Sequence, residues 1–228
     1  FLTVNDSLLN RKFTQLYPSP IILGIEEYLD GPLLSYINEL GYVSFGFEGG
    51  QHDDIASYKN HEAFIYLSLV FSGCLKKSSI DFKKYYDHLV NQSSALNSIY
   101  EIYSRYEIKK EESFKMSNGF VNFQSISKGE ELATSNGNSI FAEEHGTMFM
   151  PLYQKQGNDG YFYIRSIQPV FLNLSKWLRK IKFDRVLPLL PGVRWENKPH
   201  DTLVVNKKIA RLFAKQFFHL LGYRSKSM

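Results

Sequence analysis

The sequence predicts an α/β fold that passes into a small β-rich region and ends in a helical tail. Up to residue 75, short apolar runs alternate with helical apolar stripes, a pattern typical of α/β sheets. From 105 to 168, short strand patterns bounded by glycine and asparagine replace them. Basic helical patterns follow. We therefore expect three parts, 1–104, 105–168 and 169–228.

The composition predicts an ordinary globular protein. Of 228 residues, 43% are hydrophobic and 22% are charged. The single cysteine, Cys74, excludes an internal disulfide, and its apolar neighbours predict a buried side chain. No segment has the apolar length of a membrane span, and the first residues lack a signal-peptide pattern. We expect a cytoplasmic protein with no membrane partner.

The net charge of +4 conceals an asymmetry along the chain. Gln168–Met228 holds 13 Lys or Arg and 3 Asp or Glu, which gives +10, so the remainder holds 14 and 20, which gives −6. Such a basic tail can bind nucleic acid or an anionic surface, dock on the acidic remainder of its own chain, or stay solvated. No nucleic-acid-binding motif accompanies it. We expect docking or solvation, and no nucleic-acid partner.

The first part predicts a helix followed by a strand, a helix and a second strand. The first helix covers 8–15, and a buried strand covers 21–25. Asp30 is a suitable N-cap for the next helix, and Gly41 ends it as a left-handed residue. The two strands then form a parallel βαβ unit. This arrangement places Glu26 and Glu48 at the same edge of the sheet.

Glu48 is the main candidate for a functional residue. Val43, Phe45 and Phe47 alternate with small or polar residues, which predicts a strand that ends at this glutamate. Two glycines follow it, so a ligand can approach the backbone closely. In α/β sheets, ligands bind beyond the carboxyl ends of the strands. From the residues alone, Glu48 is either a turn carboxylate or a catalytic acid/base.

The polar loop after Glu48 does not predict a metal site. His52, Asp53 and Asp54 are consecutive, and neighbours in sequence point in different directions, which is unfavourable for chelation. Asn60 is the expected N-cap of an apolar helix that reaches Leu75.

The rest of the chain predicts further helices around the β-rich region. A Lys/Ser linker leads into polar helix between 76 and 104, with inward side chains at Tyr85, Leu89, Leu96, Ile99 and Tyr103. Hairpin-like pieces follow, including one around Asn136-Gly137. In the tail, we expect a helix at 174–181 and another between Asn206 and Gly222, with His219 as a core histidine.

The stretch Ile21–Leu75 resembles the last part of a zinc carboxypeptidase-type catalytic domain, and more closely the succinylglutamate desuccinylase/aspartoacylase branch of that superfamily. The matching parts come in order: a buried strand, a loop, a helix ending in glycine, a strand closing on Glu48 and a long apolar helix. The β-rich region, with Lys128-Gly-Glu and Gly146-Thr-Met, is similar to the C-terminal barrel of the same branch. The resemblance implies part of a carboxypeptidase-like α/β sheet domain.

The resemblance also implies a zinc-dependent hydrolase that cleaves the amide bond of an N-acyl amino acid or a related small molecule. Glu48 would activate the metal-bound water. Glu26 stands where carboxypeptidases carry a substrate-facing tyrosine and would favour a cationic group; the alternative is a loop carboxylate bonded to backbone amides. We further expect Gln51, His52, Tyr153 and Tyr161 to contact the substrate.

The chain departs from this family in its metal ligands. The family holds zinc with a His-x-x-Glu pair and a later His, and all three precede the matched segment. Residues 1–20 contain no histidine. We therefore expect the ligands upstream of Phe1 and an inactive chain in isolation. The alternative is a non-catalytic binding or assembly module with a basic interaction surface. The sequence leaves open whether the chain forms a homo-oligomer.

Overall fold

The computed structural model describes residues 1–28, 33–51, 54–93, 98–154, 157–196, 202–206 and 215–223. The chain divides into two compact units. The first unit consists of 1–5 and 9–166, and the second consists of 6–8 and 167–228. The predicted α/β class is confirmed.

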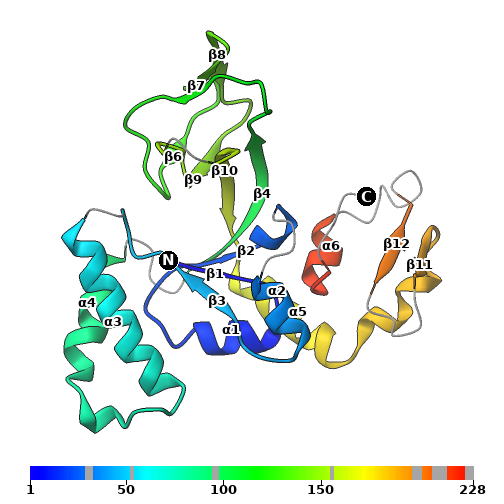
Figure 1. The fold of residues 1–228 in the computed structure, drawn as a ribbon. Helices are drawn as coiled ribbons and strands as arrows, with labels where there is room; N and C mark the ends of the chain where they lie inside the picture. The colour runs from blue at the N-terminus through cyan, green and yellow to red at the C-terminus, as the bar shows by residue number, and fades with distance from the viewer. Residues whose placement is uncertain are drawn as a thin grey trace. The chain divides into compact units, whose positions relative to one another are not determined.

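The first unit is built on a seven-stranded mixed sheet (Figure 1). Three strands, β1, β2 and β4, run parallel, and the others run antiparallel to their neighbours. In spatial order the strands are β3 (Phe45–Phe47), β1 (Leu2–Val4), β2 (Ile21–Leu23), β4 (Ile99–Glu107), β10 (Asp159–Ser166), β9 (Gly146–Phe149) and β6 (Ser125–Ile126). The side chains of β1 and β2 are buried on both faces of the sheet.

The predicted βαβ unit is wrong in one respect, the direction of its second strand. β3 pairs with β1, not with β2, and runs antiparallel to it, with Phe47 opposite Leu2. The helix between the strands, α2 (Leu33–Glu39), ends as expected before Gly41, whose φ is 85°. Ser44 then donates a hydrogen bond from its hydroxyl to the carbonyl of Leu34. This contact returns the chain along α2, so it enters the sheet edge in the opposite direction.

The helices of the first unit cover the sheet and form a hairpin. The predicted first helix is α1 (Leu8–Thr14), whose first residue belongs to the second unit. α3 (Ile55–Phe71) and α4 (Phe82–Gln92) pack on one another, joined through a 3₁₀ turn at Lys77–Ser79. The predicted start of α3 at Asn60 is wrong, because Asp54 is its N-cap and accepts from the Ala56 N–H at 2.9 Å.

The small β-rich region shares β4 with the larger sheet. The expected boundary at 104/105 falls inside this strand, whose first residues pair with β2 and whose whole length pairs with β10. Ile99 and Tyr103 therefore lie on a strand and not on the predicted helix. A second sheet contains β5 (Phe114–Met116), β7 (Glu131–Ser135) and β8 (Asn138–Phe141), with the predicted turn at Asn136-Gly137.

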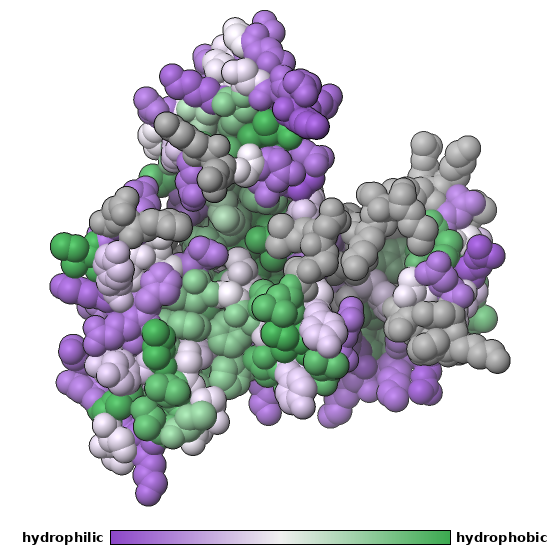
Figure 2. Space-filling view, viewed as in Figure 1, coloured by the Kyte–Doolittle hydropathy of each residue, from purple (hydrophilic) through white to green (hydrophobic). Residues whose placement is uncertain are grey.

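The core of this region contains side chains from both sheets. Its buried members are Met116, Phe120, Ile126, Leu132, Ala133, Ala142, Met148, Tyr161 and Tyr163. Residues 120–123 lie outside the strands, and Asn122 and Phe123 are in a turn. Hydrophilic side chains dominate the outer surface of the region in the view of Figure 2, whereas hydrophobic side chains gather over α2, where Leu33, Tyr36 and Leu40 are exposed.

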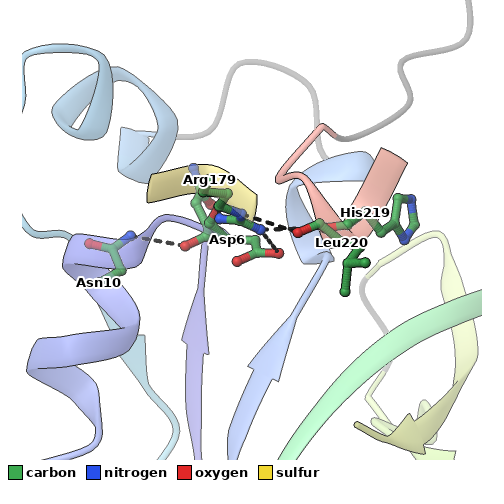
Figure 3. Close-up of polar contacts among 6 residues, drawn as sticks. Asp6, Asn10, Arg179, His219 and Leu220 are labelled. Atoms are coloured by element: carbon green, nitrogen blue, oxygen red, sulfur yellow. Dashed lines mark hydrogen bonds and ion pairs between the residues drawn. The ribbon is translucent and has the colours of Figure 1, made fainter. Parts of the chain in front are cut away.

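The second unit has its own small core and a buried ion pair. Its elements are α5 (Pro169–Lys180), the 3₁₀ helix η3 (Phe183–Leu189), β11 (Val193–Trp195), β12 (Leu203–Val205) and α6 (Lys215–Leu220). Arg179 of α5 pairs with the carboxylate of Asp6 at 2.9 Å and donates to the carbonyls of His219 and Leu220 (Figure 3). His219 is buried, as expected of a core histidine. The first part of the helix expected after Asn206 lies outside the described residues.

Two further findings bear on function. The thiol of Cys74 is exposed, so the prediction of a buried cysteine is wrong; the residue lies in the turn where α3 passes into the loop before α4. Among the helices in the described part of the chain, none combines the length and hydrophobicity needed to cross a bilayer.

Candidate functional site

Glu48 follows directly after β3, and aromatic packing fixes the end of this strand. The ring of Phe47 stacks on Phe64 of α3 with a centroid distance of 4.3 Å, and Phe45 contacts the same ring edge-on. These contacts hold β3 against α3 as well as in the sheet. The position of Glu48 therefore depends on two elements that meet through phenylalanine rings.

Residues 48–50 form a loop, here called the Glu48 loop. Hydrogen bonds to the Glu48 N–H and to the Gly49 carbonyl hold its backbone in place. The Glu48 N–H donates to the carbonyl of Phe1 at 3.0 Å. The Gly49 carbonyl accepts from the side-chain amide of Asn60 at 2.7 Å. The amide oxygen of Asn60 in turn lies 2.8 Å from Nε2 of His88 on α4. Because the Asn60 amide nitrogen donates to Gly49, its oxygen accepts, and Nε2 of His88 carries the hydrogen.

The two glycines after Glu48 allow α3 to approach the loop. A Cβ at Gly49 would lie 2.4 Å from Cε1 of His61, so a side chain there would displace the imidazole. The ring of His61 is held by Nδ1, which lies 2.8 Å from the carbonyl of Ser57, and by an edge contact with Phe47. Gly50 has a φ of 134°, a conformation that glycine adopts without strain.

The carboxylate of Glu48 is exposed, in contrast to its fixed backbone. The charged amino group of Phe1 lies nearby: it donates to the Glu48 carbonyl at 3.2 Å, and the Glu48 carboxylate favours its charged form. A carboxylate that is positioned by its main chain and open to solvent can accept a proton from a bound water or bind a cationic group. The exposed carboxylate of Glu48 can therefore be reached by a ligand.

Glu26 lies at the opposite edge of the sheet from Glu48. It belongs to the 3₁₀ turn Ile25–Glu27, which follows the carboxyl end of β2. Because β2 is parallel to β1 and β3 is antiparallel to it, the ends of β2 and β3 point in opposite directions. The expectation that both glutamates share one edge is wrong, since the alternating pattern of a strand carries no information on its direction.

The polar residues after Glu48 are only partly described. Gln51 is exposed and accepts, through its carbonyl, a hydrogen bond from the Asp54 N–H at 3.2 Å. Asp54 serves as the N-cap of α3. His52 and Asp53 lie outside the described residues. Of the loop residues expected to contact substrate, the structure therefore places Gln51 next to the Glu48 loop.

The two candidate tyrosines belong to the β-rich region. The hydroxyl of Tyr153 accepts from the Phe120 N–H at 2.8 Å and donates to the carbonyl of Ser117 at 2.9 Å. Tyr161 is buried and stacks on Tyr106, and burial raises its pKa. It pairs near the far end of β4, seven residues from Ile99, or roughly 23 Å at the usual rise per residue. These positions do not bring Tyr161 to the Glu48 loop, which lies at the Ile99 end of the sheet.

The donor set does not fit a zinc site. Among the described residues, no three His, Cys, Asp or Glu side chains come together so that they could hold a metal ion. A catalytic zinc needs three protein ligands and an open position. No step of a reaction can therefore be assigned to a metal held by these residues.

Sequence reasoning missed three residues that define the loop: Asn60, His61 and His88. Asn60 was expected as a helix cap, yet it bonds to Gly49, and the ring of His61 lies against the same glycine. His88 lies 28 residues after Asn60 along the chain, and no local pattern connects the two. The polar pair Asn60-His61, in the first half of the helical segment that follows Gly49-Gly50, was the one signal available for these two residues.

No protein-family model matches the chain, and no curated protein matches it by sequence. Two solved structures of succinylglutamate desuccinylase are similar to it. The one from Vibrio parahaemolyticus has a TM-score of 0.42 and 10% identity, and the one from Vibrio cholerae has 0.45 and 13%. Each match covers 90% of this chain and 52% of the other, so the chain spans about half the length of these structures. The fold resembles part of the succinylglutamate desuccinylase fold.

Proposed function

We propose that this chain carries the proton-transfer residue of a metal-dependent hydrolase that cleaves the amide bond of an N-acyl amino acid or a related small molecule. The observation that carries the proposal is the Glu48 loop. Its backbone is tied to Phe1 and Asn60, its glycines admit close approach, and its carboxylate is exposed. A general base needs this combination of a fixed position and a free carboxylate.

In this proposal, Glu48 accepts a proton from the attacking water and returns it to the leaving amine. Proton transfer by a positioned group accelerates such reactions by roughly 10²–10⁴. In this proposal, the zinc ligands are supplied from outside this chain. The chain alone is then inactive, and the complete protein is the form to assay.

The test is Glu48→Gln in the full-length protein, assayed for amine release from a panel of N-acyl amino acids. Glutamine keeps the size of glutamate but cannot take up a proton at neutral pH. We expect kcat to fall by roughly 10²–10⁴ with metal content unchanged. The matched control is Glu39→Gln, which changes an exposed glutamate at the end of α2 and should retain full activity. A Glu48→Gln variant with normal turnover would remove Glu48 from the mechanism.

A second candidate function is a non-catalytic binding module with a basic interaction surface. The observation that favours it is the exposed apolar stripe of α5, a helix that contains basic residues and no acidic ones. This candidate places the functional surface in the second unit and gives Glu48 no chemical role. The two candidates predict different sensitive residues and can be separated by substitution.

A further inference from the structure

α5 carries an apolar stripe whose side chains are exposed in the described part of the chain. Val170, Leu174, Trp177 and Ile181 follow one another at spacings of four, three and four residues, which places them on one side of the helix. Their exposed fractions are 72%, 39%, 57% and 48%. Phe171 adjoins the stripe and is 54% exposed. Four of these side chains belong to α5, and Ile181 is the residue directly after the helix; exposed apolar side chains grouped in this way are typical of an interaction surface.

The rotation of α5 is fixed by a different side of the helix. Leu178 is buried in the core of the second unit with Leu187, and Ser175 is buried beside it. Arg179 pairs with Asp6 and bonds to the carbonyls at the end of α6. The stripe is therefore not the packing face of the helix. In the 3₁₀ helix that follows, Val186 and Leu189 are also exposed.

Basic side chains border the stripe. Lys176 and Lys180 are exposed and lie on the side of α5 opposite Leu178, and Lys180 is three residues from Trp177, next to the stripe. α5 contains no acidic residue, and Lys182 and Arg185 follow it. From Gln168 onward, 13 basic residues stand against 3 acidic ones, which gives +10. The surface combines an apolar ridge with a cationic border.

This chemistry fits the surface of an anionic lipid bilayer better than two other occupants. A second copy of the same face would bring two strongly positive surfaces together, which opposes association. A single-stranded nucleic acid stacks on aromatic rings, but here aliphatic Val170, Leu174 and Ile181 separate the rings. Amphipathic helices with Trp, Phe and Leu on one face and lysines on the other bind in the plane of the lipid headgroups.

We propose that α5 binds an anionic membrane surface, with its apolar stripe in the headgroup region and its lysines on acidic lipids. Trp177 and Phe171 supply the aromatic side chains that favour this depth. Each lysine near an anionic leaflet contributes roughly a fivefold increase in affinity. This inference replaces the expectation of no membrane partner and does not depend on Glu48.

The experiment measures sedimentation of the full chain with vesicles of phosphatidylcholine, alone or with 30% phosphatidylserine. We expect binding to the mixed vesicles that weakens as salt is raised, and at least tenfold weaker binding to the neutral ones. In a Trp195→Phe background, the emission of Trp177 should shift to the blue on binding. Absence of binding to mixed vesicles at low salt would overturn the proposal.

Two variants and a control locate the surface. Trp177→Ala with Leu174→Ala removes apolar area, and Lys176→Glu with Lys180→Glu reverses the border; each pair should reduce binding at least tenfold with the melting temperature retained. Lys83→Glu with Lys84→Glu on α4 makes the same change in charge elsewhere and should change binding less than threefold. Equal losses in the α4 and α5 lysine variants, or tighter binding to a single-stranded oligonucleotide than to mixed vesicles, would contradict the assignment to α5.

Discussion

Asp6 and Glu48 are both carboxylates beside the short strands of the sheet, yet the protein treats them in opposite ways. The side chain of Asp6 is 1% exposed, and its charge is matched by Arg179 at 2.9 Å. The side chain of Glu48 is exposed, while its main chain is tied to Phe1 and its neighbour Gly49 to Asn60. The carboxylate of Asp6 is held in place by its partner, whereas in Glu48 the backbone is held in place and the carboxylate is exposed.

The difference separates a structural carboxylate from a functional candidate. Removing a charge from water is costly, so a buried carboxylate persists only with a partner and hydrogen bonds. Asp6 has such a partner in Arg179, and its side chain is withdrawn from solvent. Glu48 keeps its hydration and loses only conformational freedom. A binding or catalytic site requires a residue like Glu48, whose backbone is fixed and whose carboxylate can reach a ligand.

The largest expected effect comes from breaking the buried pair. Arg179→Ala leaves the Asp6 carboxylate without its guanidinium and removes donors from the carbonyls of His219 and Leu220. We expect a loss of about 3–5 kcal/mol in the free energy of unfolding, measured by urea denaturation. Lys180→Ala, on the exposed side of α5, should change it by less than about 0.5 kcal/mol. Equal losses in the two variants would show that the pair is not structural.

A smaller effect is expected where α3 contacts the Glu48 loop. Gly49→Ala places a methyl group 2.4 Å from Cε1 of His61 and forces the imidazole away from Ser57 and Phe47. We expect a loss of about 1–3 kcal/mol in unfolding free energy. Because the strain arises between these two residues, His61→Ala should recover most of it in the double variant. Strict additivity of the two changes would contradict the contact.

The hydrogen-bond chain to α4 should contribute less. Asn60→Ala removes the donor to the Gly49 carbonyl, which costs about 0.5–1.5 kcal/mol. His88→Ala acts through the same asparagine at 2.8 Å, so the double variant should lose less than the sum of the two single losses. Faster amide hydrogen exchange at 48–51 in both single variants would show the loosened loop directly. Unchanged exchange in both would exclude these residues from positioning it.

Local patterns in the sequence predicted the elements around Glu48 but not their arrangement. The left-handed Gly41 depends on neighbouring residues and is found as expected, whereas the strand predicted from Val43 to Glu48 is shorter and covers Phe45–Phe47. The direction of β3 depends on its pairing with Leu2–Val4, some 40 residues away, and no periodicity encodes that choice. The predicted shared edge of Glu26 and Glu48 was wrong for this reason.

The remaining errors also involve contacts between distant residues. Asn60 has the chemistry of a helix cap, but Asp54 takes that position and leaves Asn60 for Gly49 and His88. Ile99 and Tyr103 fit a helical stripe and equally a strand, and pairing with β2 and β10 decides between them. In each case, contacts with residues distant in sequence decided the structure, although the local pattern was compatible with the prediction.

The smallest expected effect belongs to Glu48 itself and tests the comparison most directly. Because its carboxylate is exposed and its backbone bonds do not involve the side chain, Glu48→Gln should change the free energy of unfolding by less than about 0.5 kcal/mol. Asp6→Asn, the same chemical change at a buried pair, should cost several times more, since it removes the carboxylate charge that pairs with the buried Arg179. Both are measured by urea denaturation at pH 7, where an unperturbed carboxyl is ionised. If Glu48→Gln costs about 1–2 kcal/mol, the carboxylate acts as a structural tie of its loop. Glu48 would then belong in the same class as Asp6, and the loop would lose the free carboxylate on which the proposed proton transfer depends.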